Sequence, residues 1–166
     1  MLKSYLKEIF KVAKQGDARE ESYYSVLAGL LKDYSESTRK KSIHITTLPK
    51  KTEAGNPDFR CWDGTQHIVG YIEAKAPTTE YLDRVEATEQ LKRYRQVFPN
   101  LLLTNFFEFR LYRNGTLIDS VRIGRPFVMH QLKTIPTVEK EQDFLKLLEK
   151  FFSFSLPKVY SAKTLA

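Results

Sequence analysis

Residues 56–75 read NPDFRCWDGTQHIVGYIEAK, and they are the most informative segment of the chain. Segments 59–62 and 67–75 are rich in β-branched and aromatic side chains, as strands are. Between them lies the turn-forming tetrad DGTQ, so the stretch predicts a β-hairpin. The short turn folds the start of the first arm back beside the end of the second. Asp58 is therefore expected to lie next to Glu73 and Lys75.

The second arm of this hairpin is apolar on both faces. Side chains alternate along a strand, so its residues divide into two sets, Val69, Tyr71, Glu73 and Lys75 on one face and Ile68, Gly70, Ile72 and Ala74 on the other. A strand that is apolar on both faces is an interior strand. An acid and a lysine near its end incur a burial cost unless they meet partners or a metal ion.

The rest of the chain alternates between helical and strand patterns. Apolar spacing predicts helices at 2–14, 19–34, 81–98 and 139–152, and strands at 43–48, 101–104, 107–113 and 116–122. The polar stretches 35–42 and 50–56 predict loops, and Asn114-Gly115 predicts a tight hairpin turn. The helix at 81–98 followed by an apolar strand indicates a crossover. Together these elements predict one α/β domain with a central mixed β-sheet flanked by helices.

Composition narrows the class of protein. The 166 residues include 27 Lys and Arg against 20 Asp and Glu, a net charge of +7, and a single cysteine, Cys61. One cysteine excludes an internal disulfide and a thiolate zinc cage, and fits a cytoplasmic protein. No run is long enough for a signal peptide or a membrane span, so no membrane partner is expected. The basic charge predicts an anionic partner.

The hairpin ends bring together residues that suit phosphodiester chemistry. Asp58 and Glu73 would repel each other, and a bound Mg²⁺, or Mn²⁺ in its place, relieves that repulsion. An ammonium group beside the metal, that of Lys75, can orient or deprotonate an attacking water and stabilise charge on a phosphoryl group. This set predicts hydrolysis without a covalent enzyme intermediate.

These residues resemble a known signature. Pro57-Asp58, followed by Glu73-Ala74-Lys75, looks like the motif of the PD-(D/E)XK, or restriction-endonuclease-like, nuclease superfamily, and Gln90 with Tyr94 resembles the QxxxY motif of its RecB-like branch. The resemblance implies a restriction-endonuclease-like core. It also implies that the Ala74 carbonyl adds a metal ligand and that Gln90 and Tyr94 orient the site or the scissile phosphate. Glu20, with Glu21 as the neighbouring choice, is similar to the acidic first-helix ligand of some members.

A narrower resemblance is to the N-terminal nuclease domain of fused restriction-modification enzymes, of the type I single-polypeptide or type IIG kind. It rests on residues 16–31, NPDF, IEAK and the closing SAKTLA. It implies a nuclease domain at 1–155 and the start of a connector at 156–166. Downstream methyltransferase and target-recognition domains would use S-adenosylmethionine and, where a translocase is present, ATP. Double-stranded DNA would be the substrate, cut by a transient dimer.

Basic residues near these motifs are the candidate DNA contacts. They lie in the loop before Asp58 and on the helix that carries Gln90, and are Lys50, Lys51, Arg84, Lys92, Arg93 and Arg95. The buried strand position of Cys61 predicts a structural thiol rather than a nucleophile.

Other interpretations of the same residues stay open. Asp58 alone could cap a turn, Glu73 and Lys75 could form an edge ion pair, and Glu20 could serve only as a helix-terminal acid. Alternative functions are a RecB-like exonuclease or repair nuclease, and a non-catalytic nucleic-acid-binding module on the same fold. The residues do not distinguish DNA from RNA.

Overall fold

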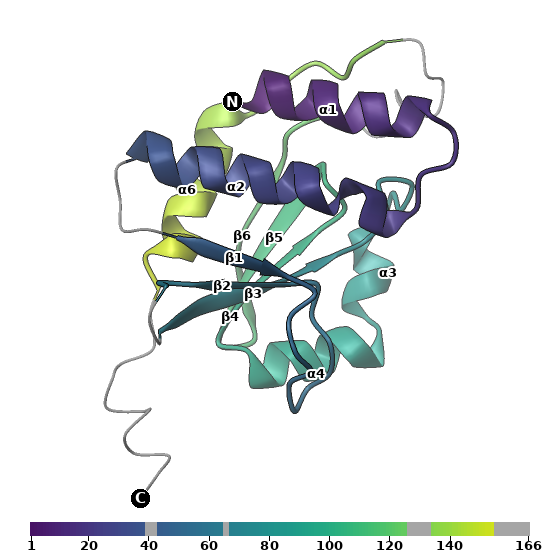
Figure 1. Cartoon of the computed structure of the whole chain (residues 1–166). Helices are drawn as coiled ribbons and strands as arrows, with labels where there is room; N and C mark the ends of the chain where they lie inside the picture. Colours follow the sequence, from purple (N-terminus) through teal and green to yellow (C-terminus); the bar gives the residue numbers. More distant parts are fainter. Residues whose placement is uncertain (39–42, 65–66, 126–133, 155–166) are drawn as a thin grey trace, which may run out of the picture.

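The computed structural model describes residues 1–38, 43–64, 67–125 and 134–154 (Figure 1). Part of the loop expected at 35–42, two hairpin-turn residues at 65–66 and the connector expected at 156–166 lie outside the described residues. The elements in chain order are α1 (Leu2–Lys14), the short 3₁₀ helix η1 (Glu20–Tyr23), α2 (Tyr24–Thr38), β1 (His44–Thr47), β2 (Phe59–Trp62), β3 (Ile68–Ala74), α3 (Leu82–Glu86), α4 (Glu89–Val97), β4 (Asn100–Thr104), β5 (Glu108–Arg113), β6 (Thr116–Arg122) and α6 (Glu141–Phe152).

The strands form one mixed sheet in the order β1-β2-β3-β4-β5-β6. Neighbouring strands are antiparallel except β3 and β4, which are parallel. Parallel neighbours require a crossover, and α3 with α4 provides it. β3 pairs on both sides, so the expected hairpin and the expected interior strand are confirmed.

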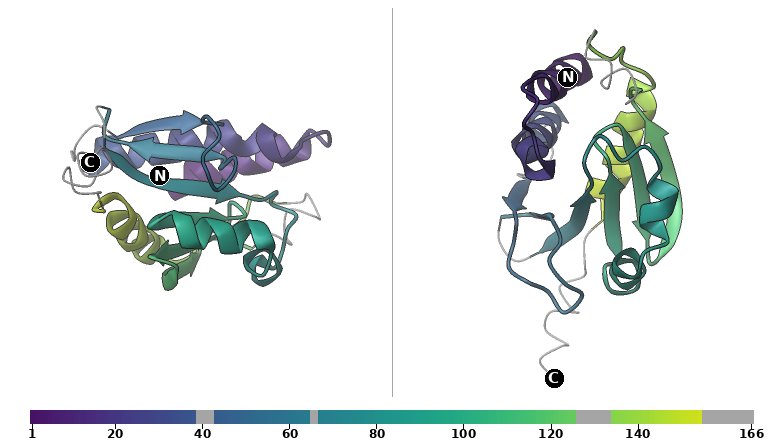
Figure 2. Two further views of the ribbon diagram at one scale, coloured as in Figure 1. Left: turned by 90° about the horizontal axis from the view of Figure 1, so that it is seen from below. Right: turned by 90° about the vertical axis from the view of Figure 1, so that its right-hand side faces the viewer.

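Helices cover both faces of the sheet, with α1, α2 and α6 on one face and α3 and α4 on the other (Figure 2). The alternation of β4 side chains follows from this arrangement. Leu102 packs into the core under α1, α2 and α6, whereas Leu101 and Leu103 pack against the α3–α4 layer. The predicted fold class, an α/β domain with a mixed central sheet flanked by helices, is confirmed. None of the helices in the described ranges has the length and apolar character needed to cross a bilayer.

Two helix predictions are wrong in their boundaries. The helix expected at 81–98 is two helices, because Thr88 has an extended backbone and its hydroxyl caps α4 by accepting a hydrogen bond from the Leu91 amide at 3.3 Å. The loop expected at 35–42 is helical as far as Thr38. The hydroxyls of Ser37 and Thr38 donate to the Tyr34 carbonyl, so these polar side chains are satisfied within α2.

One strand prediction is also corrected. Cys61 pairs with Gly70 and Trp62 pairs with Ile68, which leaves Val69 as an extra, bulged residue. The bulge turns Val69 into the core under α1, α2 and α6, so it does not share a face with Tyr71 and Glu73. Beyond the bulge the expected alternation holds up to Glu73.

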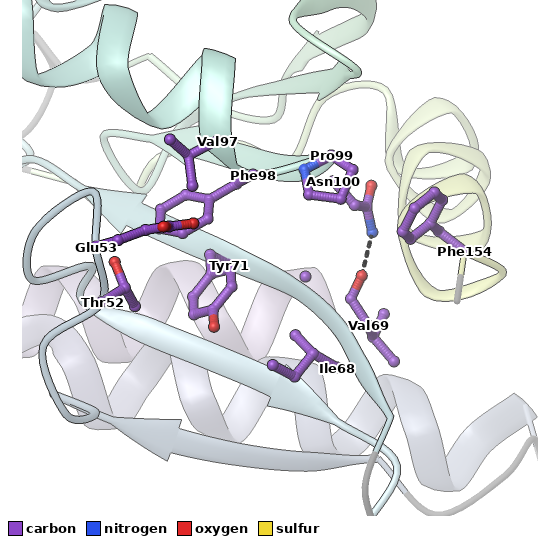
Figure 3. A pocket seen from close by; sticks show the side chains of 11 residues that line it. Thr52, Glu53, Ile68, Val69, Tyr71, Val97, Phe98, Pro99, Asn100 and Phe154 are labelled. Carbon is purple, nitrogen blue, oxygen red and sulfur yellow. Dashed lines mark hydrogen bonds between the residues drawn. The ribbon is translucent and has the colours of Figure 1, made fainter. Parts of the chain in front are cut away.

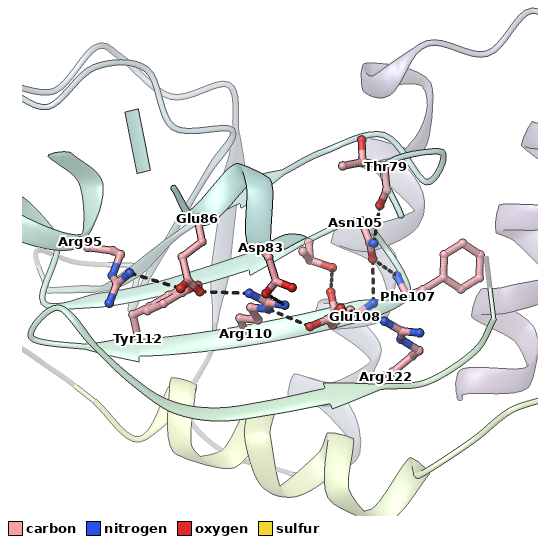
Figure 4. Close-up of polar contacts among 11 residues, drawn as sticks. Thr79, Asp83, Glu86, Arg95, Asn105, Phe107, Glu108, Arg110, Tyr112 and Arg122 are labelled. Atoms are coloured by element: carbon pink, nitrogen blue, oxygen red, sulfur yellow. Dashed lines mark hydrogen bonds and ion pairs between the residues drawn. The ribbon is translucent and has the colours of Figure 1, made fainter. Parts of the chain in front are cut away.

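An ion-pair network fixes the α3–α4 layer to the sheet (Figure 4). Arg110 on β5 lies 2.8 Å from Asp83 and 3.1 Å from Glu86 on α3, and 2.7 Å from Glu108 on its own strand. Its guanidinium group is largely buried, and such a charge is stable only when hydrogen-bonded partners surround it. The network therefore sets the position of the helices that follow β3.

Candidate active site

Asp58 is held where the loop after β1 enters β2. Its Oδ2 accepts a hydrogen bond from the Ala74 amide at 2.8 Å, and its backbone carbonyl accepts one from the Leu48 amide at 2.7 Å. The side chain is only 9% exposed. The hairpin therefore places Asp58 at the end of β3, beside Glu73, as the sequence predicts.

Glu73 is the most constrained acid of the site. It is 3% exposed, its Oε2 lies 3.2 Å from Lys75 Nζ, and its Oε1 is buried without a hydrogen-bond partner. Burial, and next the charge of Asp58, raise the pKa of Glu73 to about 8. A buried carboxylate oxygen without a donor carries an unmet demand for positive charge or a proton.

Lys75 connects this acid pair to α4. Its Nζ donates to Glu73 Oε2 and, at 3.3 Å, to Gln90 Oε1. Gln90 Nε2 in turn donates to the Tyr94 hydroxyl at 3.4 Å. Burial, followed by the charges of Glu73 and Asp58, raises the pKa of Tyr94 to about 12. The structure therefore brings Asp58, Glu73, Lys75, Gln90 and Tyr94 into one continuous cluster.

Glu20 reaches the cluster through a residue that sequence reasoning missed. The Tyr24 hydroxyl, in the first turn of α2, lies 2.7 Å from Asp58 Oδ1 and 3.1 Å from Glu20 Oε1. Burial, and next the hydrogen bond to Asp58, raise the pKa of this tyrosine. Its spacing of four from Glu20 on a helical segment was the available signal. Glu21, the neighbouring choice, is exposed.

The loop before Asp58 packs onto α4. Arg93 Nε donates to the Ala54 carbonyl at 3.3 Å, and Gly55 has φ +130°. A Cβ at Gly55 would come within 3.3 Å of the Tyr94 hydroxyl, so glycine allows the loop to approach the site this closely. Lys50 and Lys51 are exposed on this loop.

The remaining basic candidates, Arg84, Lys92 and Arg95, differ in exposure and in partners. Arg84 and Lys92 are exposed, whereas Arg95 Nη2 donates to the Gly115 carbonyl at 2.8 Å and its guanidinium lies over the Tyr112 ring. Lys92 and Arg95 are three positions apart and therefore share one side of α4, which is not the side that carries Gln90. The structure thus places Arg95 as a brace between α4 and the β5–β6 turn, and its role as a DNA contact stays a prediction.

Cys61 follows Arg60 on β2, packs in the core under α1, α2 and α6, and is fully buried. Burial raises the pKa of its thiol. The expected structural thiol, rather than a nucleophile, is what the geometry supports.

A hollow of about 360 Å³ lies between the start of β3 and the end of α4 (Figure 3). Its walls include Tyr71, whose ring stacks on Phe98 at 4.1 Å, and Asn100. The Asn100 amide donates to the Val69 carbonyl at 2.9 Å and closes one end. Tyr71 precedes Glu73 by two residues on β3, but the hollow lies along the start of that strand, and none of Asp58, Glu73, Lys75, Gln90 and Tyr94 lines it.

A divalent cation fits the acid pair on the chemistry of its donors. The buried, hydrogen-bond-free Glu73 Oε1 lies beside a second carboxylate, and oxygen ligands of this kind suit Mg²⁺. Among the residues that the structure describes, no group of three His, Cys, Asp or Glu side chains comes together as a metal site. The protein thus offers two carboxylates, those of Asp58 and Glu73. The Glu20 carboxylate is separated from Asp58 by the hydroxyl of Tyr24.

The fold and the cluster define an α/β protein that carries an acid, acid and lysine set at the end of an interior strand. Among solved structures, a cryo-EM structure of a DrdV–DNA complex is similar, with a TM-score of 0.67 and 24% sequence identity. The similarity covers 95% of this chain and 14% of that chain, and it supports the fold. No family model and no curated protein sequence matches the chain.

Proposed function

We propose that this chain is a metal-dependent deoxyribonuclease of the restriction-endonuclease type. The observation that carries the proposal is Glu73, buried beside Asp58 with one oxygen lacking a donor, and bonded through the other to Lys75. A module that only binds nucleic acid through its positive charge has no use for clustered carboxylates facing phosphates. A cation bound between the carboxylates and the phosphates of the nucleic acid removes the repulsion between these like charges.

Asp58 and Glu73 would hold Mg²⁺, or Mn²⁺ in its place, together with the Ala74 carbonyl. Glu20 would act through Tyr24, whose hydroxyl oxygen lies 2.7 Å from Asp58 Oδ1 and 3.1 Å from Glu20 Oε1, with its single proton within reach of both carboxylates. When bound, the ion supplies Lewis acidity and a more acidic water. The Ala74 amide donates a hydrogen bond to the Asp58 carboxylate and so keeps it oriented whether or not the ion is bound.

Lys75 would act on the attacking water and on the growing phosphoryl charge. Its Nζ is fixed between Glu73 Oε2 and Gln90 Oε1, so one ammonium proton stays free to point toward a substrate. Gln90 and Tyr94 would keep this ammonium group in place. A fixed positive charge beside the reacting phosphate stabilises charge that develops in the transition state.

The whole protein's activity is proposed to be restriction of double-stranded DNA by a larger enzyme. The DrdV chain in its DNA complex is about seven times longer than the part this chain resembles, which supports a nuclease domain fused to further domains. Methyltransferase and target-recognition domains, with their S-adenosylmethionine and ATP, would belong to that larger chain. Two nuclease copies would meet transiently to cut both strands.

The test is cleavage of supercoiled and linear plasmid DNA with Mg²⁺ or Mn²⁺, and with EDTA as the metal-free reference. Asp58→Asn and Lys75→Met are expected to lower the rate at least about hundredfold. Lys11→Met is the matched control, because Lys11 is exposed on α1, where it lies 3.7 Å from Glu8 in an exposed ion pair. Thermal melts of all variants check that each one is folded under the assay conditions.

Equal cleavage by wild type and either site variant, or full cleavage in EDTA, contradicts the proposal. Degradation of the linear plasmid alone favours the exonuclease alternative. Metal-independent binding of DNA without cleavage favours the non-catalytic module.

A further inference from the structure

Arg60 is a basic residue that lies near the acid pair Asp58 and Glu73 on the sheet. It lies on β2, two residues after Asp58, which directly precedes this strand. Its partner on β3 is Tyr71, which in turn precedes Glu73 by two residues. Two residues of a strand span about 6.6 Å, so Arg60 stands one such step along the sheet from the acids.

Within the described ranges of the chain, Arg60 forms no ion pair with a carboxylate. Its Nε is buried without a hydrogen-bond partner, and its guanidinium lies 5.1 Å from the centre of the Trp62 ring. Other partly buried arginines differ: Arg110 contacts three acids, and Arg113 donates to the Asn100 side chain and to the Lys150 carbonyl. Of these three arginines, Arg60 is the one whose Nε has no hydrogen-bond acceptor.

Such a group is suited to an anion. Partial burial removes water from the guanidinium, and contact with the Trp62 ring restricts its motion, so less entropy is lost when a ligand binds. The planar fork of an arginine matches two oxygens of a phosphate. Because the acid pair repels phosphate unless a cation intervenes, a separate positive group nearby has a clear use.

We infer that Arg60 binds a backbone phosphate of the nucleic-acid strand, next to the phosphate that lies at Asp58 and Glu73. The inference rests on the proposed function, and it adds a binding residue that the motifs do not include. In a nucleic-acid strand consecutive phosphates follow one another along the backbone, as Arg60 follows Asp58 along the sheet. Arg60 would fix the register of the strand on the site without reading its bases.

The test is the salt dependence of binding, measured without metal so that no cleavage occurs. The probe is a fluorescein-labelled double-stranded DNA oligonucleotide, titrated at several salt concentrations. Arg60→Gln is expected to weaken binding about five- to tenfold and to lower the slope of log affinity against log salt by about one, the signature of one lost phosphate contact. Arg60→Lys keeps the charge and should keep the slope.

Arg122→Gln is the matched control, because Arg122 is half exposed on β6, four strands away from β2. It should bind within about twofold of wild type. If Arg60 only stabilises the fold through Trp62, Arg60→Gln will lower the melting temperature and leave the salt slope unchanged, and that result overturns the inference. Arg60→Met, which fills the space over Trp62 without charge, decides the question if Arg60→Gln does not fold.

The two proposals fail in different ways. If Arg60→Gln loses DNA binding while wild type cleaves without metal or does not cleave at all, the phosphate site stands and the proposal of a metal-dependent nuclease fails. Normal binding in Arg60→Gln together with metal-dependent cleavage by wild type keeps the nuclease and removes the phosphate site.

Discussion

At the scale of single residues, the site combines groups that would be unfavourable in an ordinary core. Glu73 is buried beside Asp58, and neither burial nor a neighbouring negative charge favours its ionised form. Lys75 offsets part of this cost, but Glu73 Oε1 keeps no donor. Residues of this kind are expected where stability is exchanged for function.

This cost makes metal-free stability depend on pH. The pKa of Glu73 is raised to about 8 in the folded chain from a usual value of 4.5, so the folded state binds the proton more tightly. Its contribution is fully present below the unfolded pKa and is lost as pH rises toward about 8. We expect Glu73→Gln to raise the free energy of unfolding by about 1–3 kcal/mol at pH 8 in EDTA.

Urea denaturation of wild type and Glu73→Gln between pH 5 and pH 8 checks this expectation. Glu21→Gln serves as control because Glu21 is exposed one position from Glu20. A wild-type stability that does not fall over this range, or a Glu73→Gln variant less stable than wild type at pH 8, would be incompatible with the buried acid pair.

Tyr24 provides a second test at this scale. Its buried hydroxyl holds Asp58 and Glu20 together, so Tyr24→Phe should lower cleavage or metal affinity about tenfold. The free energy of unfolding should fall by about 1 kcal/mol. Tyr23→Phe is the neighbouring control, since the Tyr23 ring packs on Phe106. The idea fails if both variants retain the same metal affinity as wild type.

At the scale of elements, local patterns predicted most of the fold. The hairpin of β2 and β3, the β5–β6 hairpin at Asn114-Gly115 and the crossover to β4 all follow from turn chemistry and strand periodicity. The break at Thr88 was not predicted, because apolar side chains on both sides of it suggested one continuous stripe. The bulge at Val69 depends on how β3 pairs with β2, and the alternation of side chains within β3 alone does not predict it.

Gly55 tests how the loop before Asp58 supports the site. Gly55→Ala should cost about 1–2 kcal/mol, because φ +130° disfavours a side chain and the new Cβ would press on the Tyr94 hydroxyl. Gly29→Ala is a matched control within α2, where a Cβ meets nothing within 4 Å and should stabilise by up to about 1 kcal/mol.

Thermal unfolding and cleavage assays of both glycine variants complete this test. Cleavage should fall with Gly55→Ala and stay unchanged with Gly29→Ala. Full activity in Gly55→Ala would mean that the loop does not position Tyr94 or Asp58.

At the scale of the whole molecule, all three layers of the fold contribute to one site. The sheet supplies Asp58 and Glu73, the layer of α2 supplies Tyr24, and α4 supplies Gln90 and Tyr94. Motif spacing predicted the residues on β3 and α4, because both lie within or next to one hairpin. The path from Glu20 through Tyr24 to Asp58 could not be predicted, since it depends on how α2 packs across the sheet.

Asp58 and Glu73 are proposed to bind a divalent metal ion, and calorimetric titration of Mg²⁺ and Mn²⁺ at pH 8 measures that binding. Wild type should show saturable binding, and Asp58→Asn should bind at least about tenfold more weakly. Asp33→Asn, which removes an exposed charge from α2, should match wild type. Equal binding by wild type and Asp58→Asn, or no binding by wild type, would contradict the account.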